Sequence, residues 1–143
     1  MSEKYAKLSG KWAKMNDSGF EAFEAKNPGL ATGKAGHNTD DIKLAYEMSD
    51  SGFTVAYAVD GVVKTCSYVY NGALEQTSSG DVKFTTTTEF VEGGRMPGGS
   101  IGITYTMGDK VVKQENYQFH GDNRMIIETF ANDAALVTVF ERE

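Results

Sequence analysis

An alternation of apolar and polar residues runs through the chain from Asp41 onward, and it restricts the fold more than any other feature of the sequence. The apolar positions are two apart in two successive segments, at Ile42, Leu44, Tyr46 and Met48 and then at Phe53, Val55, Tyr57 and Val59. A period of two is typical of a half-buried β-strand, because successive side chains of a strand point to opposite faces. The sequence therefore predicts a mostly β protein.

Turn sequences that contain glycine separate these segments. Asp60-Gly61 and Asn71-Gly72 are typical of two-residue hairpin turns, whose central residues need positive φ. Further turns follow at intervals of roughly 9 to 14 residues, at Ser79-Gly80, Gly93 to Gly99, Gly108-Asp109, Gly121-Asp122 and Asn132-Asp133. This spacing predicts nine antiparallel strands, and a first strand over Leu8 to Met15 makes ten. We expect an all-β, ten-stranded antiparallel up-and-down barrel, since closure removes the exposed edges of such a sheet.

A short helical lid is expected between the first two strands, near residues 19–26. Ser18-Gly19-Phe20-Glu21 has the spacing of a capping box, and Phe20 and Phe23 share one helix face. Asn27-Pro28-Gly29 ends the helix, because proline cannot continue it. A second helical turn over Leu30 to His37 stays open, since its glycines also allow a mobile flap over Pro28 to Asp40.

Charge and composition exclude several classes of partner. The 143 residues carry 14 Lys and Arg against 20 Asp and Glu, and this formal charge of −6 would not hold a nucleic-acid backbone. No run approaches the roughly 18 apolar residues of a spanning helix, so stable membrane insertion is not expected. Cys66 is the only cysteine, which favours a reducing, cytoplasmic location. We expect one domain over residues 1–143, acting as a monomer.

Motifs for catalysis or metal binding are not recognisable in the sequence. His37 and His120 have no flanking carboxylate motif, and single histidines seldom mark chemistry. The glycine-rich segment 93–99 lacks the lysine and the Ser/Thr of a phosphate-binding loop. No pair of His, Cys or acidic residues has a recognised ligand spacing. We therefore expect neither an enzyme nor a cofactor.

Both ends of the chain carry the residues of a family resemblance. Gly10-Lys11-Trp12 lies in the expected first strand, Phe20-Glu21-Ala22-Phe23 follows it, and Val137 to Glu143 closes the chain. Together with ten strands, these features resemble the intracellular lipid-binding proteins, the carriers of fatty acids, retinol and retinoic acid. The resemblance implies a flattened barrel with a helical lid, which encloses one or two hydrophobic molecules. Gly-x-Trp also occurs at the start of lipocalins and avidins, which lack this early helix.

The resemblance also implies which positions contact the polar end of a ligand. Carboxylate-binding members are characterised by an inward Arg on a late strand and an Arg-x-Tyr pair on the last strand. Counted back without a gap, these positions are Gln118, Thr138 and Phe140, which are all neutral. Burying a carboxylate without a cation is costly, so a neutral-headed lipid such as retinol or retinal is favoured. Gln118 and Phe140 match the retinol-binding branch, whereas Thr138 does not.

We expect a non-enzymatic carrier of a small hydrophobic ligand, contacted by Phe20, Asn116, Gln118, Ile127, Thr138 and Phe140. The alternation disagrees about Gln118, because Tyr117 and Phe119 form the apolar face of that strand and turn Gln118 to solvent. One alternative is a fatty-acid carrier whose cation has moved, for example to Lys64 or Arg124. Two others are a lipid or small-molecule isomerase and a structural or stress-protective barrel without a specific ligand.

Overall fold

Ten antiparallel strands form a single sheet. The computed structural model describes residues 2–27, 43–59, 62–77, 83–91 and 99–143. The strands are β1 (Gly10–Ser18), β2 (Lys43–Met48), β3 (Gly52–Val59), β4 (Val62–Val69), β5 (Gly72–Thr77), β6 (Lys83–Val91), β7 (Ser100–Met107), β8 (Lys110–His120), β9 (Arg124–Ala131) and β10 (Ala134–Arg142). Their order in the sheet is β4-β3-β2-β1-β10-β9-β8-β7-β6-β5. The predicted ten-stranded up-and-down topology is therefore confirmed.

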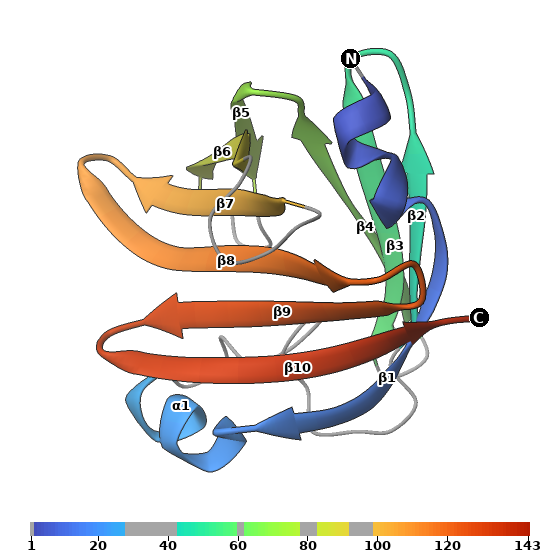
Figure 1. Ribbon diagram of the computed structural model, residues 1–143. Helices are drawn as coiled ribbons and strands as arrows, with labels where there is room; N and C mark the ends of the chain where they lie inside the picture. Colours follow the sequence, from blue (N-terminus) through green and yellow to red (C-terminus); the bar gives the residue numbers. More distant parts are fainter. Residues whose placement is uncertain (1, 28–42, 60–61, 78–82, 92–98) are drawn as a thin grey trace.

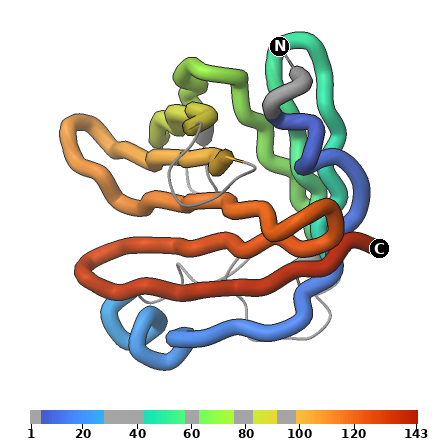
Figure 2. Tube along the Cα trace, in the orientation of Figure 1, coloured from blue at the N-terminus to red at the C-terminus, as the bar shows by residue number. Residues whose placement is uncertain are grey.

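The sheet curls into a nearly closed barrel. β7 to β10 form one layer that crosses in front of β2, β3 and β4, and the meander can be followed from strand to strand (Figures 1 and 2). β4 and β5 are the two ends of the strand order, and in the described residues no ladder joins them. Asn71, with φ of +50°, turns the chain at this seam. The expected paired hairpin at Asn71-Gly72 is therefore wrong, because no ladder joins β4 to β5 and, of the two turn residues, only Asn71 has the positive φ that such a turn needs.

One short α-helix, α1 (Phe20–Lys26), follows β1 as predicted, but its start differs from the prediction. A register shift after Lys14 carries β1 on to Ser18, which pairs with Val137 instead of capping the helix. Gly19 is the N-cap, with φ of +87° and no side-chain cap hydrogen bond. The capping box is therefore wrong, because the β1–β10 ladder takes Ser18. We predicted a flap or a second helical turn within residues 28–40, and turns at residues 60–61 and 79–80. These three segments lie outside the described residues.

Gly19 is expected to tolerate no side chain. A Cβ atom there would lie 2.6 Å from the carbonyl oxygen of Ala135, and the backbone is left-handed. We expect Gly19→Ala to lower the free energy of unfolding by about 3 kcal/mol, of which about 1 kcal/mol is conformational strain. Urea denaturation measures the change. Gly108→Ala is the matched control, since Gly108 has φ of +61° with nothing within 4 Å, and should show only the strain.

Apolar side chains line the barrel between the two layers, and a helix covers each end. The 3-10 helix η1 (Ser2–Leu8) buries Tyr5, whose ring centroid lies 4.5 Å from that of Tyr70 and 5.8 Å from that of Phe90. At the other end, Phe23 of α1 packs with Ala131 and Leu136. Neither helix has the length and apolar character of a bilayer-spanning segment, as far as the described residues go. The main buried cluster of side chains therefore lies in the barrel interior, between the two helix-covered ends.

Candidate ligand-binding site

Tyrosine hydroxyls meet in the interior of the barrel, in two pairs. Tyr46 on β2 donates a hydrogen bond to Tyr117 on β8, with 3.1 Å between the oxygens. The hydroxyl oxygens of Tyr68 on β4 and Tyr105 on β7 are 2.7 Å apart. β2 and β4 belong to one layer and β7 and β8 to the other (Figure 1). Each pair therefore bridges the two layers through the interior.

A buried carboxylate ends the second pair. Glu115 on β8 is 2% exposed, and the Tyr105 hydroxyl donates to its Oε1 atom over 2.6 Å. A tyrosine hydroxyl has one proton to donate. Because Tyr105 gives this proton to Glu115, Tyr68 must be the donor in the bond between the two tyrosines. The interior therefore contains a directed hydrogen-bond chain from Tyr68 through Tyr105 to Glu115.

The four bridging tyrosines stay protonated far above neutral pH. Desolvation by burial raises the pKa of Tyr46, Tyr68, Tyr105 and Tyr117 well above the ordinary value of 10, because it disfavours the charged phenolate. The nearby charge of Glu115 raises the pKa of each of them further. At neutral pH the four phenols in the interior are therefore neutral.

Two lysines on the inner face of the barrel were missed by the sequence analysis. Lys14 is the cross-strand partner of the buried Phe140, and its Nζ atom lies 2.6 Å from Oδ2 of Asp17, with the two side chains 2% and 15% exposed. Lys113 on β8 is half-buried, and its Nζ atom lies 4.2 Å from the centroid of the Tyr105 ring. The alternation contained the signal, since Lys14 is two residues after Trp12 and Lys113 precedes Glu115 and Tyr117 by two and four.

Three of the predicted ligand contacts face the interior. Ile127, Thr138 and Phe140 are fully buried, and Ile127 and Phe140 belong to the main apolar core. Phe20 is half-buried and packs against the separate cluster of Phe23, Ala131 and Leu136 at the rim, so its expected place in the cavity is not what the structure shows. Ligand contact by Ile127, Thr138 and Phe140 stays a prediction.

The other two predicted contacts, Asn116 and Gln118, lie on the outer face of β8. They alternate with the buried Glu115, Tyr117 and Phe119, and Gln118 Nε2 donates to Glu128 Oε1 over 2.6 Å. The alternation thus gave the correct facing and the count without gaps did not. A difference of one residue in the turns that join β8, β9 and β10 is sufficient to reverse the facing of a strand.

The cations that were considered for a fatty-acid carboxylate also lie elsewhere. Lys64 is exposed on β4. Arg124 is exposed and pairs with Glu141 at 2.8 Å. Among the described residues, no group of three or more His, Cys, Asp and Glu side chains could hold a metal ion. In the part of the chain that the structure describes, the charged groups at the inner face are therefore Lys14 with its partner Asp17, Lys113 and Glu115.

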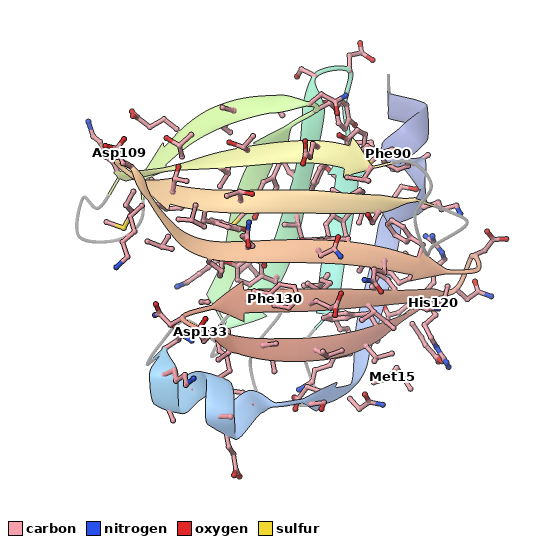
Figure 3. The ribbon with its side chains drawn as sticks, turned by 60° about the vertical axis from the view of Figure 1, so that its left-hand side comes forward. Met15, Phe90, Asp109, His120, Phe130 and Asp133 are labelled. Carbon is pink, nitrogen blue, oxygen red and sulfur yellow. The ribbon has the colours of Figure 1, made fainter. Side chains whose placement is uncertain are left out.

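A pocket of about 420 Å³ opens at the rim, beside Lys113. The β7–β8 turn at Asp109 and the β9–β10 turn at Asp133 lie at this end of the barrel, whereas Phe90 and His120 lie at the other (Figure 3). The pocket is lined by residues 111–114 of β8 and residues 130–135 of the β9–β10 hairpin. Phe130 is exposed there, and Val112 also packs against the apolar core. The pocket therefore lies next to the polar interior.

The strand order and the helix after β1 define a class of fold, that of the fatty-acid-binding proteins. Among solved structures, the chain is similar to the REP1-NXSQ fatty acid transporter, with a TM-score of 0.70, 14% sequence identity, and coverage of 96% of this chain and 97% of that one. It is equally similar to fatty-acid-binding protein 1 of Echinococcus granulosus, with a TM-score of 0.70, 14% identity and coverage of 96% and 98%. No protein-family model and no curated protein sequence matches the chain.

Proposed function

We propose that this chain is a non-enzymatic binding protein that holds a small hydrophobic molecule between the two layers of its barrel. The observation that carries the proposal is an apolar interior with a few convergent polar groups, the usual chemistry of a small-molecule site. The named functions of the similar structures, fatty-acid transport and binding, support it. We also propose that residues 1–143 form one domain, which acts as a monomer in the cytoplasm.

A neutral polar end is the form of ligand that the interior charges favour. Thr138 and Phe140 supply no cation, and the buried ammonium of Lys14 already has a carboxylate partner in Asp17. An incoming carboxylate would also meet the buried Glu115, whereas Lys113, the other inward cation, already lies over the Tyr105 ring. Retinol and retinal are therefore the leading candidates, as in our sequence analysis.

A long-chain fatty acid is the second candidate. The similar structures are a fatty acid transporter and a fatty-acid-binding protein. The inward Lys14 is a cation that could receive a carboxylate if Asp17 moved away, and such charge-assisted hydrogen bonds are strong. Mass spectrometry of organic extracts from the purified protein separates the two candidates. If no lipophile copurifies and none binds, a structural barrel without a specific ligand is the better interpretation.

Titration with retinol and retinoic acid tests the head-group preference. We expect retinol to bind about ten- to a hundredfold more tightly, since the acid loses an ion contact of about 1.5 to 3 kcal/mol. The fluorescence of Trp12, the single tryptophan, follows binding. Thr138→Arg places a cation on the inner face and should narrow the preference. Gln118→Arg places it on the outer face and should not, and a wild type that prefers the acid contradicts the neutral ligand.

A further inference from the structure

Asn71 is the only asparagine of the chain that is followed by glycine, and it lies exposed in the turn between β4 and β5. Asparagine is a chemically labile residue, and a following glycine has no side chain to hinder attack by its backbone nitrogen. We propose that Asn71 is a site of spontaneous modification, in which its side-chain amide becomes a carboxylate, and that Tyr5 of η1 controls the rate. The proposal is independent of any ligand in the barrel interior.

The reaction needs no partner other than water. The backbone nitrogen of Gly72 attacks the side-chain carbon Cγ of Asn71, a bond forms between these two atoms, and the bond from Cγ to Nδ2 breaks. The amide nitrogen takes up the proton of the Gly72 N–H and leaves as ammonia, so that a cyclic succinimide remains. Water then opens the ring at one of its two carbonyl carbons, and the product is aspartate or isoaspartate.

Two hydrogen bonds direct the side chain of Asn71 away from this reaction. The Tyr5 hydroxyl donates to Oδ1 over 2.9 Å, and the backbone N–H of Phe90 donates to the same atom over 3.4 Å. The β5–β6 ladder ends at the pair of Gly72 and Thr88, so the Asn71 side chain supplies an acceptor to a β6 amide beyond the ladder. The side chain is thus directed toward η1 and β6, whereas ring closure requires it to turn back toward Gly72.

Packing fixes the position of the Tyr5 hydroxyl, which makes the shorter of the two bonds. Tyr5 is fully buried, and its ring centroid lies 6.1 Å from that of Phe53 as well as close to those of Tyr70 and Phe90. The bond from Tyr5 to Asn71 is therefore lost only when η1 moves away from this end of the barrel. Modification of Asn71 should follow such local opening, because opening releases the side chain for ring closure.

The two products differ in their effect on this contact. Aspartate leaves the backbone unchanged and still offers an oxygen to Tyr5 and Phe90, so both hydrogen bonds are retained. Isoaspartate carries the main chain through the side-chain carbons, which lengthens the turn by one carbon and moves the acceptor away from both donors. The isoaspartate form should therefore hold η1 less firmly at the end of the barrel.

Incubation at mildly alkaline pH, followed by peptide mapping with mass spectrometry, tests the proposal. In the wild type we expect Asn71 to be converted faster than the exposed Asn123, which precedes an arginine. Tyr5→Phe keeps the ring and should raise the rate at Asn71 about fivefold, the effect of one neutral hydrogen bond. Gly72→Ala should nearly abolish the reaction, and the turn accommodates this change, since the new Cβ would lie 3.4 Å from Cγ2 of Val69.

Tyr70→Phe is the matched control and should leave the rate unchanged. The Tyr70 ring packs against that of Tyr5, but its hydroxyl has no hydrogen-bond partner within the described part of the chain. A rate in Tyr5→Phe that equals the wild-type rate or falls below it overturns the control by Tyr5. If Tyr5→Phe does not fold, the wild type unfolded in urea replaces it, and conversion of Asn71 no faster there than in the folded protein overturns the proposal. Wild-type conversion of Asn71 no faster than that of Asn123 overturns it too.

Discussion

The protein is expected to unfold steeply as the pH rises above about 10. Burial raises the pKa of Tyr46, Tyr68, Tyr105 and Tyr117 well above 10, so in that range the unfolded chain loses four protons that the folded chain retains. Stability from a raised pKa is complete below the unfolded value and is lost as the pH climbs toward the folded one. One group contributes about 1.4 kcal/mol per pH unit, and four together contribute about 5.5 kcal/mol per pH unit.

Circular dichroism and tyrosinate absorbance, recorded together against pH, measure this effect. We expect the two signals to change in one transition for the buried tyrosines, because their phenols ionise only when the barrel opens. Tyr46→Phe removes one ionising group and should lower the slope by about 1.4 kcal/mol per pH unit. Ionisation of all seven tyrosines near pH 10 in a protein that keeps its β spectrum would contradict the burial of these four.

Local sequence patterns predicted the strands and the facing of their side chains. On β8, the alternation separates Tyr117 from Gln118 correctly, because a strand that borders an apolar core allows only one face to be buried. The count from the family resemblance failed at the same place, since it carried an assumed turn length across two hairpins. The face of the sheet on which a side chain lies is therefore predicted better from the alternation within its own strand than from a residue count that starts at another strand.

At the start of α1, pairing between β1 and β10 overrides the local capping pattern. Ser18 and Glu21 have capping-box spacing, but β1 pairs with β10 as far as Ser18 and leaves Gly19 as the N-cap. The register shift after Lys14 extends this pairing. No short-range pattern announces such a shift, because it depends on where a strand more than a hundred residues away begins and ends.

The polar site was beyond prediction from sequence for a related reason. Tyr46 and Tyr117 are 71 residues apart, and Tyr68 and Tyr105 are 37 apart, so their pairing depends on how the sheet curls. Glu115 and Lys14 stand at buried positions that are seldom occupied by charged residues. Each lies two residues from an inward aromatic side chain, Glu115 from Tyr117 and Lys14 from Trp12, and only their partners in space explain why they are tolerated there.

Removing one partner from the ion pair of Lys14 and Asp17 is expected to cost the fold several kcal/mol. Its atoms are 2.6 Å apart, and the side chains are 2% and 15% exposed. Asp17→Asn should lower the free energy of unfolding by about 3 kcal/mol, because it removes a negative charge that compensates a buried ammonium. Urea denaturation measures the loss. The double variant Lys14→Met, Asp17→Asn should recover most of it, since an apolar replacement of a buried pair is often neutral.

Glu141→Gln is the control for this prediction, because it breaks an exposed ion pair. The side chains of Arg124 and Glu141 are 55% and 42% exposed. An exposed pair contributes under about 1 kcal/mol, so the stability of this variant should stay close to that of the wild type.

Adding palmitic acid or hexadecanol to Asp17→Asn then decides between the two classes of ligand. If Lys14 serves a fatty-acid carrier, the acid restores stability and the alcohol does not. Equal effects of the two leave the fatty-acid candidate without its cation.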